Sequence, residues 1–173
     1  MNFISLKRNW IKTKLGNVAE EIRELVEPNK TEAYPYIGLE HIEQQTLKLK
    51  DVGISDDVVS TKKVFKEGDI LFGSLRPYFR KVVRPTFSGV CSTDITVIRA
   101  KDNTDTAFLY YFIASQDFID YSTNISSGTR MPRASWKVLS ESEWYFPPLS
   151  TQRKIASILT AYDELIENNL RRI

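Results

Sequence analysis

The stretch GDILFGSLRPYFRKVVRPTFSGVCSTDITVIRAK, residues 68–101, decides the fold class of this chain. Residues 70–72 are a short apolar run that follows a glycine-aspartate turn signal, a pattern typical of a buried β-strand. Pro77 then interrupts the pattern, because proline has no amide hydrogen to donate within a sheet. Residues 91–101 predict a second strand. Two strands joined by a proline-broken loop predict a mainly β core.

The sequence on the N-terminal side of this stretch predicts further short elements. Residues 17–25 predict a short helix or a helix-to-strand unit, with Asn17 as the N-cap. Residues 34–42 and 46–54 predict strands, and the alternation of leucine and lysine in the second indicates one solvent-facing side. The N-terminal third therefore fits a fold of short strands with little helix.

On the C-terminal side, residues 106–121 form the clearest helical pattern inside the domain. Their apolar side chains form a wide face at helical spacing, and Asp105 or Thr106 is a suitable N-cap. Together with the strands, this helix predicts an α/β fold of the mixed α+β type, in which a twisted, mainly β core is flanked by helices.

The last segment of the chain predicts a separate long helix. Two prolines at 147–148 require extended backbone before them, and Ser150 is a suitable N-cap. From 151 to 173 the apolar residues follow a seven-residue repeat, which is typical of a helix that packs against a partner helix. At 1.5 Å per residue this helix would be roughly 34 Å long. We therefore divide the chain into a domain of residues 1–148 and a helix of residues 149–173.

The expected partner-facing residues of this helix share one face: Ile155, Ile158, Leu159, Tyr162, Leu165, Ile166, Asn169 and Ile173. Asn169 would be a polar residue within an apolar contact, of the kind that fixes register. Burial against another chain or a second copy is favoured, because a helix this long at the end of the chain has little of its own domain to pack against. Packing on its own domain is the alternative.

The composition fits one globular domain with an appended helix. Of 173 residues, 42% are hydrophobic and 27% are charged, which are ordinary values for a globular protein. The lone Cys91 excludes an internal disulfide, and no spacing of cysteine and histidine fits zinc. The N-terminus lacks the apolar run of a signal peptide, and no stretch approaches the roughly 20 apolar residues of a membrane span. We therefore expect a cytoplasmic protein without a metal site or membrane contact.

Basic residues are concentrated in one part of a nearly neutral chain. The net charge is +2 overall, whereas residues 60–101 contain nine basic and three acidic residues. Such a basic segment is typical of a phosphate-binding face. An ordinary solvated surface is the alternative, and charge clustering alone does not separate the two.

The sequence contains no recognisable catalytic motif. His41 is the only histidine, and Cys91, His41 and Asp94 match no nucleophile signature in their order or flanking residues. No glycine-rich phosphate loop is present. The FPPLS sequence lacks the amide or carboxylate before the prolines, and the aromatic residue after them, that mark DNA amino-methyltransferases. We therefore expect a chain that is not an enzyme and binds no cofactor.

Four motifs in one order, residues 68–101 together with FLYYFIASQDFIDY, SSGTRMPRASWKVL and FPPLSTQRKIASILTAYDELIENNLRRI, resemble the DNA specificity (S) subunits of type I restriction-modification systems. The resemblance extends from about Trp10 to the C-terminus. It implies a target recognition domain, which reads one half of a split DNA sequence, followed by a conserved spacer helix that docks methyltransferase (modification) subunits. It also implies that catalysis belongs to those subunits and to a separate restriction subunit.

The chain departs from this family in length. Family members usually carry two recognition domains and two spacer helices that pack antiparallel. One domain and the start of one helix would make either a half-subunit that forms a homodimer or a fragment of a longer chain. A symmetric dimer would read a split palindrome, because the order of half-sites mirrors the symmetry of the protein.

Ten residues are expected to contact double-stranded DNA. Those in the basic segment are Lys62, Lys63, Arg76, Arg80, Lys81 and Arg84. Those in the sequence GTRMPRASWKVL, residues 128–139, are Thr129, Arg130, Arg133 and Lys137. Arginine pairs bidentately with guanine, whereas lysine mainly neutralises phosphate. Structural roles are the alternative for Arg76, because LRPY is shared by proteins that read different sequences, and for the second loop, which Pro132 and Trp136 would anchor.

Two other classes of protein stay open on the sequence alone. An enzyme, such as a nuclease or a methyltransferase, would need a metal or cofactor site. An interaction protein that regulates the methyltransferase subunit shares the helix but requires no sequence-specific DNA binding.

Overall fold

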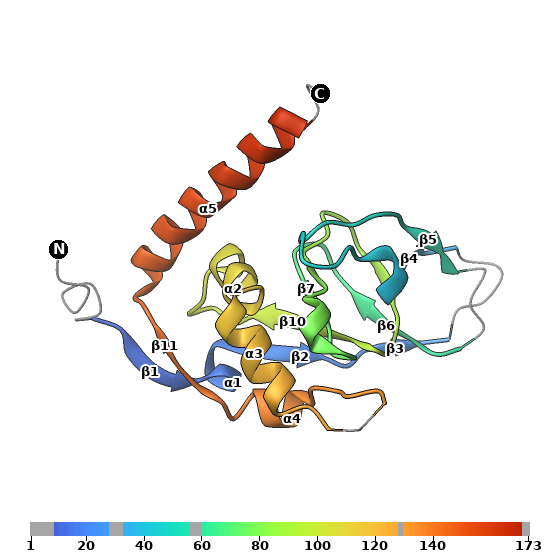
Figure 1. The fold of residues 1–173 in the computed structure, drawn as a ribbon, viewed down its shortest axis with the longest axis horizontal. Helices are drawn as coiled ribbons and strands as arrows, with labels where there is room; N and C mark the ends of the chain where they lie inside the picture. The colour runs from blue at the N-terminus through green and yellow to red at the C-terminus, as the bar shows by residue number, and fades with distance from the viewer. Residues whose placement is uncertain (1–8, 28–32, 56–59, 128–129, 171–173) are drawn as a thin grey trace.

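A computed structural model describes residues 9–27, 33–55, 60–127 and 130–170 of the chain (Figure 1). Its elements, in chain order and with η for a 3-10 helix, are β1 (Ile11–Lys14), α1 (Leu15–Val18), β2 (Ala19–Ile22), β3 (Leu25–Val26), β4 (Pro35–Ile37), η1 (Leu39–His41), β5 (Gly53–Ile54), β6 (Lys62–Phe65), β7 (Ile70–Gly73), η3 (Pro77–Phe79), β8 (Val82–Val83), β9 (Gly89–Cys91), β10 (Ile95–Ala100), α2 (Thr106–Ile113), α3 (Gln116–Asn124), α4 (Trp136–Leu139), β11 (Glu143–Phe146) and α5 (Leu149–Leu170).

Two small sheets and a two-stranded ribbon form the β part of the fold. The first sheet has the strand order β2-β10-β7-β8 and is antiparallel throughout. The second has the order β3-β6-β9-β4-β5, in which β4 and β9 are parallel. Strands β1 and β11 form the ribbon, which lies at the end of the molecule opposite the second sheet (Figure 1). The mixed α/β fold with a mainly β core and flanking helices is therefore confirmed.

The central strands are buried on both faces because their side chains alternate between two hydrophobic cores. In β7, Ile70 and Phe72 lie in the core shared with α2 and α3, while Leu71 lies in the core shared with the second sheet. In β10, Ile98 and Val97 divide between the two cores in the same way. Strands covered on both faces carry continuous apolar runs rather than alternating ones. This double burial explains why the apolar run in β7 predicted its strand correctly.

The helix expected at 106–121 is two helices, α2 and α3, separated by Ser115. The Ser115 hydroxyl caps α3, accepting from the Phe118 amide at 3.4 Å and donating to the Phe112 carbonyl at 2.6 Å. A serine that bonds to nearby backbone groups competes with a continuous helix, so the chain turns here. The N-cap expected at Asp105 is confirmed, because its carboxylate accepts the Phe108 amide at 2.9 Å.

The N-terminal elements differ in part from expectation. Residues 17–25 do contain a helix-to-strand transition, but Asn17 lies inside α1 rather than at its N-cap. The strand expected at 34–42 is the short β4, followed by η1. The strand expected at 46–54 is wrong over most of its length, since Leu47 has a φ of 62°, in the left-handed region, and pairing is limited to β5 and an isolated β-bridge between Leu49 and Ile42.

Helix α5 begins at Leu149, directly after the two prolines, so that Ser150, the expected N-cap, lies inside its first turn. Its first turns pack on the domain: Gln152 is 3% exposed, accepts from the Asp105 amide at 2.9 Å and donates to the Pro147 carbonyl at 2.9 Å. Farther along, the helix projects away from the domain (Figure 1). Among the residues that the structure describes, no helix has the length and apolar character needed to cross a bilayer.

Candidate nucleic-acid interface

Lys62 and Lys63 lie in β6, and both have partners inside the molecule. Lys62 is 4% exposed; its ammonium donates to the carbonyl two residues earlier at 2.8 Å and lies 5.7 Å from the centre of the Tyr36 ring. The Lys63 ammonium donates to the Ile95 carbonyl at 2.8 Å and lies 3.6 Å from a Glu21 carboxylate oxygen. Because Glu21 and Ile95 belong to the first sheet and Lys63 to the second, Lys63 links the two sheets.

Arg80 and Lys81 lie in the connection between β7 and β8, which contains η3 and which we call the corner. Arg80 has a φ of 50°, in the left-handed region, and its Nε donates to the Ala114 carbonyl at 2.7 Å. The Lys81 ammonium donates to the Leu39 carbonyl, and burial lowers its pKa. These donors satisfy carbonyls at the end of α2 and in η1, so the two cations fasten neighbouring elements to the corner.

Arg76 joins the same corner to the loop at 130–137. Its backbone amide donates to the Pro132 carbonyl at 2.8 Å, and its Nη2 donates to the Arg130 carbonyl at 3.2 Å. Its Nε is buried and has no acceptor within the described part of the chain. Arg76 also has a φ of 52°, so the corner has a left-handed residue on each side of η3.

Arg84 lies on a different part of the surface, beside α5. Its guanidinium carbon lies 5.5 Å from the centre of the Tyr110 ring, and burial raises the pKa of that tyrosine. Arg84 and Tyr110 line a groove of about 580 Å³, to which α5 contributes Asp163 and Ile166. The basic segment at 60–101 is thus divided among several places and does not form one surface.

The loop at 130–137 carries exposed cations on a fixed backbone. Arg130, Arg133 and Lys137 are exposed, while Thr129 lies outside the described residues. The Ala134 amide donates to the Ser74 carbonyl at 3.0 Å, and Arg133 forms a β-bridge with Leu75. The Trp136 ring is half-buried against the main core. The loop is therefore anchored at its centre and its end.

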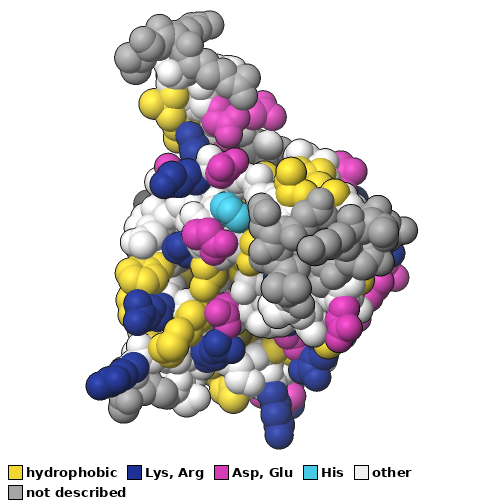
Figure 2. All heavy atoms as spheres, turned by 90° about the vertical axis from the view of Figure 1, so that its right-hand side faces the viewer, with side chains coloured by type: hydrophobic (Ala, Val, Ile, Leu, Met, Phe, Trp, Pro, Cys, Tyr) yellow, Lys and Arg dark blue, Asp and Glu magenta, His cyan; other side chains and the backbone are white. Residues whose placement is uncertain are grey.

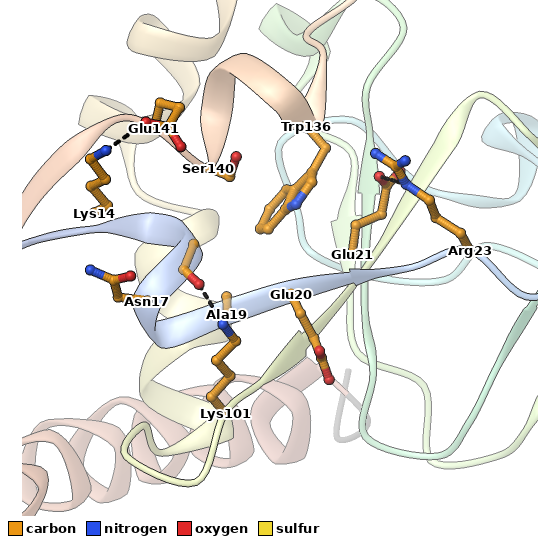
Figure 3. Close-up of a pocket in the computed structure, with 11 residues that line it drawn as sticks. Lys14, Asn17, Ala19, Glu20, Glu21, Arg23, Lys101, Trp136, Ser140 and Glu141 are labelled. Carbon is orange, nitrogen blue, oxygen red and sulfur yellow. Dashed lines mark hydrogen bonds and ion pairs between the residues drawn. The ribbon is translucent and has the colours of Figure 1, made fainter.

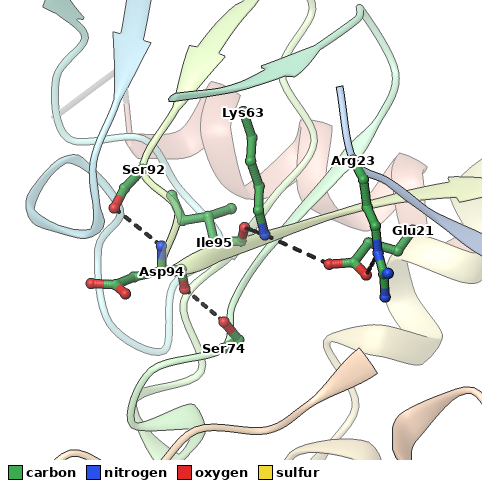
Figure 4. A network of polar contacts seen from close by, with 7 residues as sticks. All are labelled: Glu21, Arg23, Lys63, Ser74, Ser92, Asp94 and Ile95. Carbon is green, nitrogen blue, oxygen red and sulfur yellow. Dashed lines mark hydrogen bonds and ion pairs between the residues drawn. The ribbon is translucent and has the colours of Figure 1, made fainter. Parts of the chain in front are cut away.

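A groove of about 390 Å³ separates this loop from the strands β2 and β3. Its lining includes Arg23, Leu25, Thr96, Arg133, Ser135 and Trp136, and we call it the arginine groove. The Arg23 side chain is 71% exposed, and its Nε donates to a Glu21 carboxylate oxygen at 2.6 Å (Figure 4). Arg133 forms an ion pair with Asp94, with side-chain exposures of 52% and 27%.

Sequence reasoning missed three members of these ion pairs, Arg23, Glu21 and Asp94. The spacing of Glu21 and Arg23, two residues apart along extended backbone, places both side chains on one face and was an available signal. Nothing in the sequence indicated the contact of Asp94 with Arg133, because the two residues are brought together only by the fold.

A neighbouring groove of about 390 Å³ shares Trp136, Glu21 and Arg23 with the arginine groove (Figure 3). Its two lysines have partners: Lys14 donates to Glu141 at 2.7 Å, and Lys101 donates to the Gly16 carbonyl at 2.6 Å. Because these ammonium groups are paired within the molecule, this groove offers little free positive charge to an anionic ligand.

The side of the molecule that carries the second sheet has mixed charge. Figure 2 shows Lys and Arg side chains interspersed with acidic and hydrophobic ones, rather than forming a continuous basic surface. Affinity for a phosphate backbone on such a surface would depend on individually placed cations.

Of the residues considered for nucleophilic chemistry, Cys91 lies in an environment that opposes it. Cys91 is fully buried, and burial raises the pKa of its thiol to about 12, which opposes formation of the reactive thiolate. The Nδ1 atom of His41 accepts a hydrogen bond from the Gly38 amide at 2.9 Å. Within the described ranges, no cluster of three histidine, cysteine or acidic side chains could hold a metal ion.

The partner-facing residues expected on the C-terminal helix separate into two groups. Ile155 packs against the core of its own domain. The exposed members are Ile158 (58%), Leu159 (36%), Tyr162 (62%), Leu165 (55%) and Ile166 (52%). Asn169 is exposed, and Ile173 lies outside the described residues. Packing on its own domain therefore holds for the first turns of the helix, and burial of the exposed part against another chain or a second copy stays a prediction.

The domain of two sheets has exposed arginines around a groove, and the long helix joined to it has exposed apolar side chains among its described residues. Residues 7–173 match the family model of the type I restriction modification DNA specificity domain, and the chain belongs to this family. The resemblance noted from the sequence motifs is therefore confirmed.

Known relatives are similar along nearly the whole chain. The type I restriction enzyme EcoDI specificity subunit of Escherichia coli is 33% identical, over 96% of this chain and 38% of its own length. The HindI specificity subunit of Haemophilus influenzae is 27% identical, over 93% and 37%. The crystal structure of the HsdS subunit from Thermoanaerobacter tengcongensis shares the fold, with a TM-score of 0.76 and 24% identity over 95% of this chain and 44% of that one. The chain thus spans less than half the length of these relatives.

Proposed function

We propose that this chain is the DNA-reading part of a type I restriction-modification specificity subunit. Residues 1–148 would bind one half of a split target in double-stranded DNA, and residues 149–173 would contact partner proteins. The observation that carries the proposal is the match of residues 7–173 to the DNA specificity domain family. The naming of the curated relatives as specificity subunits supports it.

The proposed DNA face is the arginine groove and the loop beside it. Arg23 and Arg133 line the groove, and Arg130 and Lys137 lie on the loop, all exposed to solvent. Their exposure distinguishes them from Lys62, which is 4% exposed. The partners of Lys63, Arg80 and Lys81 are backbone carbonyls of the same molecule, so we assign those cations to the stability of the fold. Phosphate contacts by free cations supply affinity, while contacts to base edges supply specificity.

In this proposal the chain supplies recognition and no catalysis. Methyltransferase subunits, and through them a restriction subunit, would carry out the chemistry at the site that the chain selects. The chain would need no cofactor of its own. Because the proposed target is DNA, we place this assembly in the cytoplasm.

The exposed face of α5 is the proposed protein contact. Ile158, Tyr162 and Leu165 are each more than half exposed, at 58%, 62% and 55%. A continuous apolar surface of this kind marks a contact site. The proposed occupants are the methyltransferase subunits and a second copy of the chain. Two copies paired through α5 would present two DNA faces related by a two-fold axis, and would read a split palindrome.

The DNA face can be tested by the salt dependence of binding. Labelled random-sequence duplex would be titrated with the chain at several salt concentrations, with fluorescence anisotropy as the readout. The measured quantity is the slope of the logarithm of the binding constant against the logarithm of the salt concentration, which we call the salt slope. The double variant Arg130→Ala/Lys137→Ala is expected to lower the magnitude of the salt slope by about two, since each phosphate contact contributes about 0.9. The control Arg153→Ala/Lys154→Ala removes two exposed cations from α5 and should leave the slope unchanged. Equal slopes in the wild type and the Arg130→Ala/Lys137→Ala variant would contradict the assignment.

A further inference from the structure

Arg133 and Asp94 form an ion pair, and the backbone around each of the two residues is held in place by hydrogen bonds. An Arg133 Nη2 contacts an Asp94 carboxylate oxygen, and the two side chains retain exposures of 52% and 27%. The pair is therefore open to solvent, and Arg133 lines the arginine groove. An exposed pair of this kind contributes little to stability, so its presence calls for another explanation.

The backbone around Asp94 is rigidly held. The Asp94 amide donates to the Ser92 hydroxyl at 3.2 Å, and the Asp94 carbonyl accepts from both the Ser74 amide at 3.0 Å and the Ser74 hydroxyl at 2.8 Å (Figure 4). Ser74 is 7% exposed and directly follows β7. The Asp94 carboxylate thus projects from a turn that is fastened to the central strand of the first sheet.

The backbone around Arg133 is attached to the same point. Arg133 exchanges two backbone hydrogen bonds with Ser127, at 3.0 and 3.2 Å, and the next amide, that of Ala134, donates to the Ser74 carbonyl at 3.0 Å. Ser74 therefore holds both the turn that carries the carboxylate and the loop that carries the guanidinium. Long arginine side chains usually lose rotamer freedom on binding, but this one is already restrained before any ligand arrives.

We infer that Asp94 is a positioning residue that orients the Arg133 guanidinium for bidentate pairing with a guanine in the major groove. This inference rests on the proposed function. A guanidinium has five N–H donors, so one contact with Asp94 leaves donors free for guanine O6 and N7. The neighbouring carboxylate also makes Arg133 a poor phosphate ligand, because it offsets the positive charge. Arg133 is thus suited to read a base, and Arg130 and Lys137, which form no ion pair with the part of the chain that the structure describes, are suited to hold the DNA backbone.

A second arginine of the arginine groove repeats this arrangement. Arg23 is 71% exposed, while its partner Glu21 is 10% exposed and lies 3.6 Å from Lys63. A buried carboxylate with a second cationic neighbour is held in place, as Asp94 is by its backbone contacts. The recurrence of an exposed guanidinium on a fixed carboxylate within one groove supports a role in recognition for the Arg133 pair.

The test is selection of bound duplexes from a random library with the wild type, Arg133→Lys, Asp94→Asn and the control Asp102→Asn. Asp102 is exposed and lies in the turn after β10, so its substitution makes the same change in charge. Arg133→Lys removes the bidentate geometry but keeps the charge. It is expected to reduce the preference for one G·C pair at least about tenfold, and Asp94→Asn should relax the same position. Asp102→Asn should give the wild-type motif, and all four proteins should have similar melting temperatures.

The outcomes distinguish base recognition by Arg133 from phosphate binding, and they test the positioning role of Asp94. Loss of preference at the same single position in Arg133→Lys and Asp94→Asn supports the inference, because a merely structural role would not select one base pair. A motif unchanged in Arg133→Lys, with weaker binding to every sequence, would make Arg133 a phosphate ligand and overturn it. A motif unchanged in Asp94→Asn alone would overturn the positioning role. No enriched motif with the wild type, either alone or with a methyltransferase subunit, would overturn the proposed function, and this inference with it.

Discussion

The Tyr111 hydroxyl donates a hydrogen bond to an Asp163 carboxylate oxygen at 2.7 Å and lies 3.4 Å from the Thr160 hydroxyl. Tyr111 belongs to α2, and both partners belong to α5, about three to four turns from the start of that helix. This contact therefore fastens α5 to the domain at the place where the helix begins to project into solvent. The direction of the projecting half, and with it the placement of any partner, depends on this contact.

Replacing Tyr111 with phenylalanine should loosen α5 without affecting the sheets. Loss of one hydrogen bond to a charged group in a half-buried site is expected to cost about 1 kcal/mol of unfolding free energy. Hydrogen exchange of α5 amides beyond Thr160 should become faster, while exchange in β7 and β10 should change only by the global amount. Tyr162→Phe is the matched control, because Tyr162 is 62% exposed. Equal exchange in the two variants would show that the Tyr111 contact does not hold the helix.

The Asp69–Arg99 pair should be among the most important polar contacts for stability. Asp69 is 3% exposed and accepts Arg99 Nε at 2.7 Å and Arg99 Nη2 at 2.8 Å, as well as the Lys66 amide at 2.8 Å. Asp69→Ala is expected to cost about 2 kcal/mol, less than the loss of a fully buried pair because Arg99 is about a third exposed. Urea denaturation measures this. Glu141→Ala, which removes an exposed ion pair with Lys14, should lower the unfolding free energy by clearly less, and an equal cost for both variants would contradict the ranking.

Cys91 should lower stability at high pH. Burial raises the pKa of its thiol from 9.0 to about 12, so between these values the unfolded chain ionises Cys91 and the folded chain does not. The unfolded state then binds fewer protons, and the unfolding free energy should fall by up to about 1.4 kcal/mol per pH unit as the pH rises above 9. The difference in stability between the wild type and Cys91→Ala should shrink over this window. A difference that is constant from pH 8 to pH 11 would be inconsistent with a buried neutral thiol.

A charged residue on the exposed face of α5 should abolish association without unfolding the domain. Leu165 is 55% exposed, so Leu165→Glu has no domain packing to disrupt. Light scattering over a range of concentrations, with and without a methyltransferase subunit, should show that the variant forms neither the homodimer nor the mixed complex that we propose for the wild type. Ile11→Glu, at a position that is 69% exposed on β1, is the control and should associate normally. Association of Leu165→Glu at the wild-type level would place the partner contact elsewhere.

The sequence predicted best where a local pattern and the tertiary environment agree. The apolar run of β7 predicts a buried strand, and the strand is buried on both faces. The leucine-lysine alternation at 46–54 is a strand pattern by itself, but the left-handed backbone at Leu47 makes it a loop. Ser115 was read as part of one helix because its capping bonds are not visible in apolar periodicity.

The residues of the proposed DNA face were harder to predict for a specific physical reason. Charge clustering counts cations but does not reveal their acceptors, and the acceptors of Arg80, Lys81 and Lys63 are backbone carbonyls from distant segments. Arg23 and Asp94, which the sequence did not single out for this face, lie in ordinary local sequence and reach their positions only when the two sheets and the loop at 130–137 assemble.

The most direct test of the central claim is selection of bound sequences from random duplex DNA by the wild-type chain, with and without a methyltransferase subunit. The account predicts enrichment of a defined half-site, and a split palindrome wherever two copies associate through α5. A chain that binds DNA without enriching any sequence in either condition would contradict the claim that this domain reads DNA.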